Sequence, residues 1–195
     1  MKKVLYILFV FGIGVNSSFS QTEFKSDKHN LIYQIQVEDY QIVELIELND
    51  GSFNGTLTHS IWKTNRMGIR KKQISQRITI PNSTVGKLVS ELKEIGIENL
   101  KDCSEIQDCI IGLDGTTVSF LTSSSENINT ASFWELESDY YYNQNKVELP
   151  AEVIKARKLI SIVNKEFDLK EQFQNFLNRL PKGRYAYSML IMRKK

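Results

Sequence analysis

Apolar and polar residues alternate along much of the first half of the chain, and a period of two is typical of strands with one buried face. The first expected strand carries on one face Leu31, Tyr33, Ile35 and Val37. A second strand is expected at 42–48, and a third returns over about 52–63. Asn49-Asp50-Gly51 between them predicts a hairpin, because Asn and Gly tolerate the positive φ of a tight turn. A loop at about 65–72 then leads to a strand at 73–80.

Three segments carry the apolar stripe of an amphipathic helix. The first follows Pro81, with Asn82 or Ser83 as its cap, and ends at Gly96. The second begins at Pro150, since proline is favourable in the first turn of a helix. The third follows Asp168, whose spacing to Glu171 is that of a capping box, and it ends at Pro181.

The remaining strands of the second half are marked by short apolar runs. Leu113-Asp114-Gly115 lies between apolar runs at 110–112 and 116–122, which predicts another hairpin. A strand at 129–136, a loop of about thirteen residues at 137–149 and a closing strand at 184–193 complete the pattern. The sequence therefore predicts an α+β fold of antiparallel hairpins or a meander, with one helix in the first half, two helices near the C-terminus and a closing C-terminal strand.

The first twenty residues have the pattern of a signal peptide. Lys2 and Lys3 precede an apolar run of about twelve residues at 4–15, which is short for a bilayer span. Cleavage is expected after Ser20, which leaves Gln21 as the new N-terminus of a periplasmic or secreted protein; the alternative is an uncleaved membrane anchor. Residues 21–30 read as a loose lead-in, and 31–195 as one domain, with 31–100 and 101–195 as two sub-halves of it.

Removal of the signal peptide makes the chain formally neutral. The full chain has 25 Lys and Arg against 23 Asp and Glu, and taking away Lys2 and Lys3 leaves 23 of each. A neutral chain argues against nucleic acid as a partner, because phosphate backbones are bound by a concentrated positive field. The basic runs at 70–72 and 193–195 are therefore interpreted as a solvated loop and a solvated tail.

Cys103 and Cys109 are the only cysteines, and export would place them in an oxidising compartment, so a disulfide between them is expected. The chain-entropy model gives such a short loop roughly 2 kcal/mol of stabilisation. A zinc site would need two further ligands, and redox pairs usually have the shorter Cys-x-x-Cys spacing.

Sequence motifs of catalysis or cofactor binding are missing, and no cofactor or metal is expected. His59 shares its strand face with apolar neighbours, so it is interpreted as a packed core residue. A cluster of acids lies around the cysteines at Asp102, Glu105, Asp108 and Asp114. A calcium site is conceivable there, but the spacing is not that of an EF-hand, and a solvated acidic loop is favoured.

The stretch Ser132–Asn143, with sequence SFWELESDYYYN, carries the candidate binding residues Glu135, Glu137, Asp139, Tyr140, Tyr141 and Tyr142. Continued strand alternation would place Trp134 and Leu136 toward the core, and Phe133 on the face of the two glutamates. Three consecutive tyrosines cannot all point inward, so at least one should be exposed, and exposed aromatics beside carboxylates suit a sugar or a basic protein partner. The alternative is a loop lid whose tyrosines pack on the helix that follows Pro150.

Three functions remain open from the sequence. The favoured one is an exported, non-catalytic interaction module, similar in kind to an inhibitor, an immunity protein or an envelope accessory protein. The second is a module that binds a carbohydrate or another small ligand. The third is a hydrolase that uses carboxylates alone. The expected partner is accordingly an unknown protein or a glycan, without nucleic acid and without a membrane span after signal cleavage.

Overall fold

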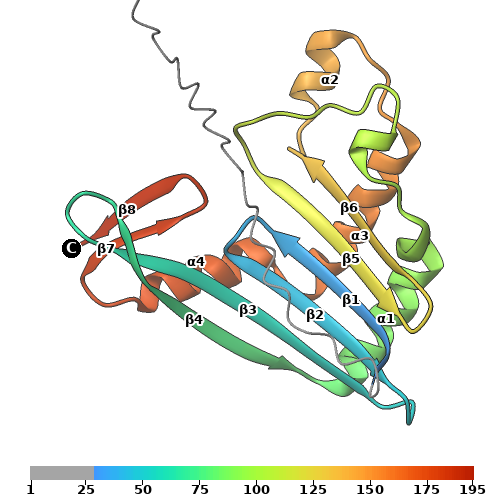
Figure 1. The fold of residues 1–195 in the computed structure, drawn as a ribbon, viewed down its shortest axis with the longest axis horizontal. Helices are drawn as coiled ribbons and strands as arrows, with labels where there is room; N and C mark the ends of the chain where they lie inside the picture. The colour runs from blue at the N-terminus through green and yellow to red at the C-terminus, as the bar shows by residue number, and fades with distance from the viewer. Residues whose placement is uncertain (1–28) are drawn as a thin grey trace, which may run out of the picture.

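The computed structural model describes residues 29–195 and has the α+β fold that the sequence predicts (Figure 1). The described residues form one curled antiparallel sheet of eight strands, in the order β6-β5-β1-β2-β3-β7-β8 with β4 paired to β3. The strands are β1 (His29–Val37), β2 (Gln41–Leu48), β3 (Phe53–Thr64), β4 (Arg70–Ile80), β5 (Thr117–Ser124), β6 (Ile128–Trp134), β7 (Gly183–Tyr187) and β8 (Leu190–Lys194). The helices are α1 (Asn82–Ile95), α2 (Tyr140–Asn145), α3 (Ala151–Phe167) and α4 (Leu169–Arg179).

The first three strands form the expected meander. In β1, Tyr33 and Ile35 are buried on one face, opposite Leu45 and Val43 of β2. The turn at 49–51 lies between β2 and β3, and Gly51 takes a φ of 78° there. The strand period and the turn residues therefore predicted this hairpin correctly.

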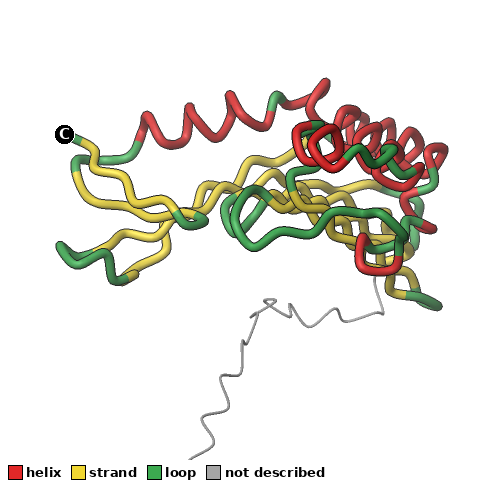
Figure 2. Tube along the Cα trace, turned by 90° about the horizontal axis from the view of Figure 1, so that it is seen from above, coloured by secondary structure: helices red, strands yellow, loops and turns green. Residues whose placement is uncertain are grey.

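The helices α1, α3 and α4 lie over one face of the sheet (Figure 2). The main core lies under α1 and α3, where Leu88 and Leu159 are fully buried with Phe120 of β5. A smaller second core lies under α4 and joins it to β3 and β7; its buried members are Ile61, Phe173, Phe176, Leu177, Leu180 and Tyr185. The chain thus has a larger body and an arm made of α4, β7 and β8.

The predicted hairpin at 113–115 is wrong. Residues 110–112 form no strand, because β5 already pairs with β1 on one edge and with β6 on the other. A strand has only two edges for hydrogen bonding, so the apolar run before the Asp-Gly turn has no partner edge. Leu113 is accordingly fully exposed.

Other element boundaries also differ from the prediction. The expected closing strand is two strands, β7 and β8, with a turn at Ser188, whose φ is 48°. Strand β1 begins at His29, two residues earlier than the expected strand start at Leu31. Helix α1 has Pro81 at its N-cap position and no side-chain cap, which corrects the expectation for Asn82 and Ser83. For α4, Asp168 accepts a hydrogen bond from the amide of Glu171, as one half of a capping box does.

The predicted signal peptide at 1–20 lies outside the described residues. Within 29–195, every helix is too short or too polar to cross a bilayer.

Candidate functional site

The end of β6 determines where the candidate residues lie. Ala131 and Phe133 are both buried, since alternate residues of a strand share a face. Trp134 therefore lies on the opposite face, which makes the expected orientation of Phe133 and Trp134 wrong. Glu135 has a φ of 46°, which breaks the alternation, and Leu136 returns to the core as expected. The expected strand at 129–136 extends two residues beyond Trp134, where β6 ends.

Trp134 anchors the segment that was expected to be a hairpin. Its indole Nε1 donates to the carbonyl of Asp114 at 2.7 Å, and its ring packs on Tyr141 with centroids 4.4 Å apart. Gly112 and Gly115 lie so close to the indole that a Cβ on either residue would collide with it. Trp134 is thus a structural residue that holds 112–115 against the end of the sheet.

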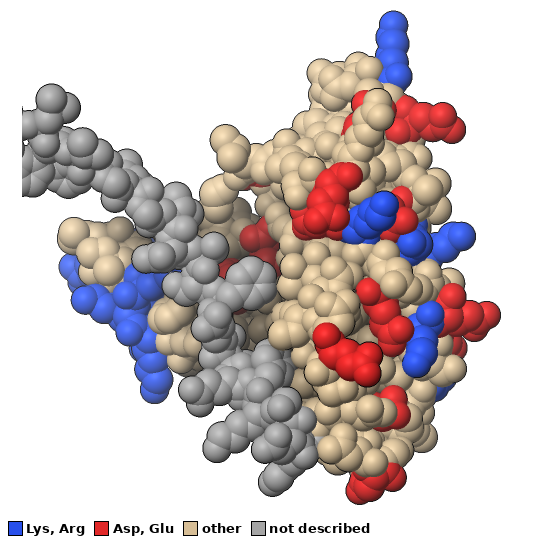
Figure 3. Space-filling model, turned by 45° about the vertical axis from the view of Figure 1, so that its right-hand side comes forward, with Lys and Arg blue, Asp and Glu red and all other residues tan. Residues whose placement is uncertain are grey.

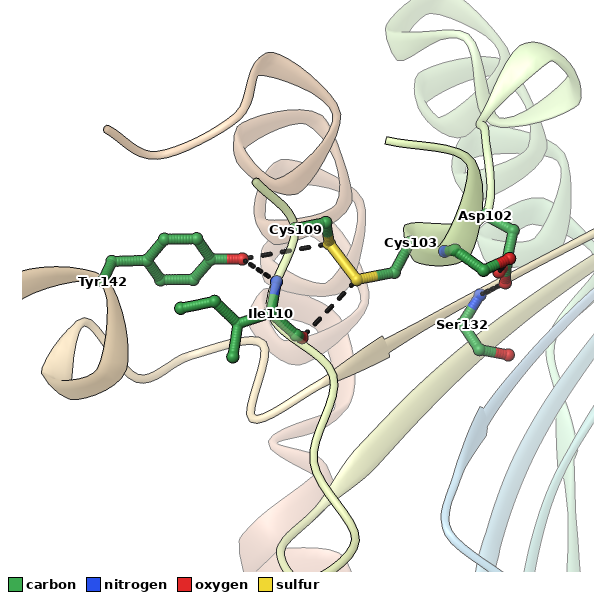
Figure 4. Close-up of a disulfide and its surroundings, with 7 residues drawn as sticks. Asp102, Cys103, Cys109, Ile110, Ser132 and Tyr142 are labelled. Carbon is green, nitrogen blue, oxygen red and sulfur yellow. Dashed lines mark hydrogen bonds between the residues drawn. A yellow bond between two sulfur atoms is a disulfide. The ribbon is translucent and has the colours of Figure 1, made fainter. Parts of the chain in front are cut away.

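The disulfide lies beside the same segment (Figure 4). Cys103 and Cys109 are bonded, with their sulfur atoms 2.01 Å apart, so the expected pairing is confirmed. The Tyr142 hydroxyl donates to Cys109 Sγ at 3.9 Å and accepts from the amide of Ile110 at 3.4 Å. Tyr142, the third tyrosine of the run, is therefore buried and supports the disulfide loop.

The acids near the disulfide are not arranged for a metal. Asp102 accepts from the amide of Ser104 at 2.9 Å through Oδ1 and from the amide of Ser132 at 2.8 Å through Oδ2. Burial alone would raise the pKa of Asp102, but these hydrogen bonds outweigh it and hold the pKa below its ordinary value. No three His, Cys, Asp or Glu side chains within 29–195 gather as a metal site would require. Asp102 instead ties the disulfide loop to β6.

The tyrosine stretch forms α2 and its N-terminal turn, where a loop was expected. Tyr142 is buried, Tyr141 is half-buried against Trp134, and Tyr140 is 63% exposed, which confirms that at least one tyrosine is exposed. The packed-lid interpretation describes this stretch well, although its tyrosines pack on Trp134 and the disulfide loop.

Arg157 of α3 holds this lid in place. Its guanidinium donates to the carbonyls of Leu136 at 2.6 Å and Ser138 at 3.0 Å, and forms an ion pair with Asp139 at 2.6 Å. A planar guanidinium suits such a set of acceptors, because its donors point outward in a fixed fork. Asp139 therefore has a structural partner.

A hollow of about 750 Å³ opens between the arm and the body. Helix α4 and the β7–β8 turn form one wall, while α3 and the ends of β1, β5 and β6 form the other. In Figure 3 the molecule is visibly hollowed between these two parts. Of the candidate residues, Glu135 and Glu137 line this hollow, whereas Asp139 and the three tyrosines do not.

Three aromatic residues from distant parts of the chain meet in the hollow. Tyr40 stacks on Phe173 with centroids 4.4 Å apart, and Tyr187 packs edge-on against both rings at 5.4 and 5.0 Å. Burial, and then the charge of Glu38, raises the pKa of Tyr40 to about 12, so its hydroxyl stays protonated at neutral pH. The hollow thus has an aromatic wall with hydroxyl groups.

Polar side chains face each other across this apolar surface. Glu135 and Glu137 lie on the body side, and Asn164 donates to Glu137 Oε1 at 3.4 Å. Lys170 and Gln174 lie on the arm side, where their spacing of four places them on one face of α4. The sequence pointed to the two glutamates, but no local signal could join them to residues of α4 and β7.

His59 is a packed core residue, as predicted. It is fully buried, and its ring stacks on Phe176 with centroids 5.6 Å apart. Burial lowers the pKa of His59 to about 4, so the ring is neutral at neutral pH. Gln41 Nε2 lies 3.3 Å from His59 Nδ1 and donates to the carbonyl of Leu169 at 2.7 Å.

Comparison of this chain with protein-family models and with curated proteins finds no match.

Proposed function

We propose that this protein is an exported, non-catalytic binding module whose binding site is the hollow between arm and body. The observation that supports this most strongly is the convergence of polar groups over an aromatic and aliphatic surface: the carboxylates of Glu135 and Glu137, the amides of Asn164 and Gln174, and the ammonium group of Lys170. Binding sites for small molecules are concave, largely apolar and supplied with a few such polar groups. A volume of about 750 Å³ also falls within their usual range of roughly 300–1,000 Å³.

The ligand class that fits this surface is a glycan. Sugar rings present apolar C–H faces and polar hydroxyl edges, and Tyr40, Phe173 and Tyr187 offer ring surface beside hydrogen-bonding groups. Glu137 can accept from sugar hydroxyls, while Gln174 and Lys170 can donate to them. The aromatic rings can therefore contact the apolar faces of a sugar, and the polar side chains can bind its hydroxyl groups.

Export rests on two features of the chain. The apolar run at 4–15 has the length and flanking charge of a signal peptide. The Cys103–Cys109 disulfide suits an oxidising compartment such as the periplasm or the cell exterior. A binding module of the cell envelope or of a secreted fraction is consistent with both.

We assign Glu135 and Glu137 to binding and not to catalysis, because Glu135 is already engaged in a hydrogen bond that holds the fold. Glu135 Oε1 accepts from the amide of Thr116 at 2.6 Å and fixes the start of β5 to the end of β6. A glycosidase would need two carboxylates that are both free to act on the scissile bond. Glu137 is the more exposed of the pair and is better placed to contact a ligand.

A glycan array probed with the intact protein tests this proposal. We expect retention of at least one glycan, and a loss of affinity of about 10- to 100-fold when Glu137→Ala or Gln174→Ala removes one hydrogen-bonding group. Tyr140→Ala is the matched control, because Tyr140 is exposed and lies outside the hollow. Absence of any bound glycan, or binding that survives both hollow variants, would contradict the proposal.

Binding of a protein partner at the α2 surface would show the opposite response to these substitutions. A partner recovered by pull-down that depends on Tyr140 but not on Gln174 would move the function to the α2 surface. Tyr142 is unsuitable for this test, since it is buried and its removal would disturb the disulfide loop.

A further inference from the structure

One end of the molecule gathers positive charge from three separate parts of the chain. An open hollow of about 810 Å³ lies there, and its described lining contains seven basic residues and no acidic one. We call these seven residues the basic end: Lys63, Arg66, Lys182, Arg184, Arg193, Lys194 and Lys195. Figure 3 shows Lys and Arg gathered at this end of the face drawn. The tail at 193–195, which seemed isolated in the sequence, thus joins a larger cluster.

The charges of the basic end are held close together by the fold. The Arg184 guanidinium donates to the carbonyl of Arg66 at 2.8 Å, and Lys194 Nζ donates to the carbonyl of Leu177 at 3.0 Å. All six ion pairs among the described residues use other bases, so none of the seven is neutralised by a described acid. Concentrated like charge without counter-charge favours a polyanionic partner.

Exposed apolar side chains lie near these charges, on the β3–β4 turn and on β8. Three of the ten large hydrophobic residues that the described chain exposes belong here: Met67, Ile69 and Ile191. The turn contacts β8, since a Cβ added to Gly68 would lie 2.9 Å from Ile191 Cδ1. Arg70 links the turn to the β7–β8 hairpin by donating to the carbonyl of Ser188 at 3.0 Å. These three apolar residues are called the apolar tips.

We propose that the basic end and the apolar tips together bind the surface of an anionic lipid bilayer. Anionic headgroups attract clustered Lys and Arg, and the apolar boundary beneath them accepts aliphatic side chains. An acidic polysaccharide or a nucleic acid would complement the charges, but it would leave Met67 and Ile191 in water. The protein would bind at the bilayer surface without crossing it. This proposal assigns the protein a location and does not depend on the proposed glycan binding.

Co-sedimentation with lipid vesicles tests the electrostatic half. The protein recovered after secretion is mixed with vesicles of phosphatidylglycerol and phosphatidylcholine, and with vesicles of phosphatidylcholine alone. We expect binding to the anionic vesicles only, weakened on the order of 100-fold when three bases of the basic end are replaced. That triple variant is Lys63→Gln, Lys182→Gln and Arg193→Gln. The matched control removes three exposed bases of the body, by Lys101→Gln, Lys158→Gln and Lys165→Gln.

The apolar half is tested with Met67→Ser combined with Ile191→Ser. These side chains are 79% and 62% exposed, so the fold does not need them, and vesicle binding should weaken about tenfold. Ile128→Ser is the control, because Ile128 is 64% exposed at the far edge of the sheet. Full vesicle binding by the tip variant would show attraction by charge alone and overturn the lipid assignment. Equal binding by the two triple variants, or no binding to anionic vesicles, would overturn the proposal as a whole.

Discussion

Neutral burial of His59 makes a definite prediction about stability in acid. The ring lies on β3 under α4, fully buried beside Phe173 and Phe176. One hydrogen of the Gln41 amide points to the Leu169 carbonyl, and the other is available to His59 Nδ1. His59 Nε2 has no hydrogen-bond partner among the described residues. A proton added to this ring would place a charge in an apolar layer, which explains the lowered pKa.

The size of the effect follows from the two pKa values. The pKa is about 4 in the folded protein and 6.5 in a model side chain, so the unfolded chain takes up this proton at a higher pH. The stabilisation is therefore complete above pH 6.5 and declines as the pH falls toward about 4. Between about pH 7.5 and about pH 4.5, His59 alone should lower the free energy of unfolding by roughly 2–3 kcal/mol.

His59→Leu isolates this contribution, because leucine fills the site without binding a proton. Urea unfolding, followed by tryptophan fluorescence at both pH values, gives the loss of stability in acid for each protein. The unaltered chain should lose roughly 2–3 kcal/mol more than His59→Leu, and carboxylates that titrate in the same range cancel in this difference. His29→Gln, which removes the other histidine, should retain the larger loss. Equal losses in the unaltered chain and in His59→Leu would refute the reasoning.

Three further changes test the packing around the hollow and the sheet. Arg157→Lys keeps the charge but loses the fork that binds two carbonyls and Asp139, and should cost about 1–2 kcal/mol in urea unfolding; an unchanged midpoint would contradict that role. Reduction of the Cys103–Cys109 bond should lower the free energy of unfolding by roughly 2 kcal/mol, measured with and without reductant, and no difference would remove its structural role. Gly55→Ala places a Cβ 2.6 Å from Val85 Cγ2 and should lower the free energy of unfolding by about 1–3 kcal/mol in thermal or urea unfolding. Unchanged stability would show that α1 can shift away from β3 at no cost.

Elements with a sustained period were predictable from the sequence, because their pattern is local. The stripe of α1, the Asn-Asp-Gly turn before β3 and the Pro150 start of α3 all satisfy rules that involve neighbouring residues alone. The errors arose where a local pattern competed with pairing at a distance. Residues 110–112 resemble a strand, but β1 and β6 already occupy both edges of β5.

The candidate site was only partly predictable for the same reason. Glu135 and Glu137 stood out by composition, and the structure places both in the hollow. Their opposite wall depends on the pairing of Trp62 with Ala186, which brings β7 and the Tyr187 ring back to the end of β3. Nothing near either residue in the sequence specifies that pairing, so the aromatic wall could not be expected. The tyrosine run stood out by composition too, yet Tyr142 supports the disulfide loop and Tyr141 packs on Trp134.

We propose that the hollow between arm and body is the binding site, and an NMR titration tests this most directly. The isotope-labelled protein is titrated with the glycan that the array retains most strongly, and the shifts of backbone amides are mapped. Our account predicts that the largest shifts fall on Glu137, Asn164, Lys170 and Gln174, around the hollow. Shifts centred on Tyr140 and the remainder of α2, or spread without a centre, would contradict it.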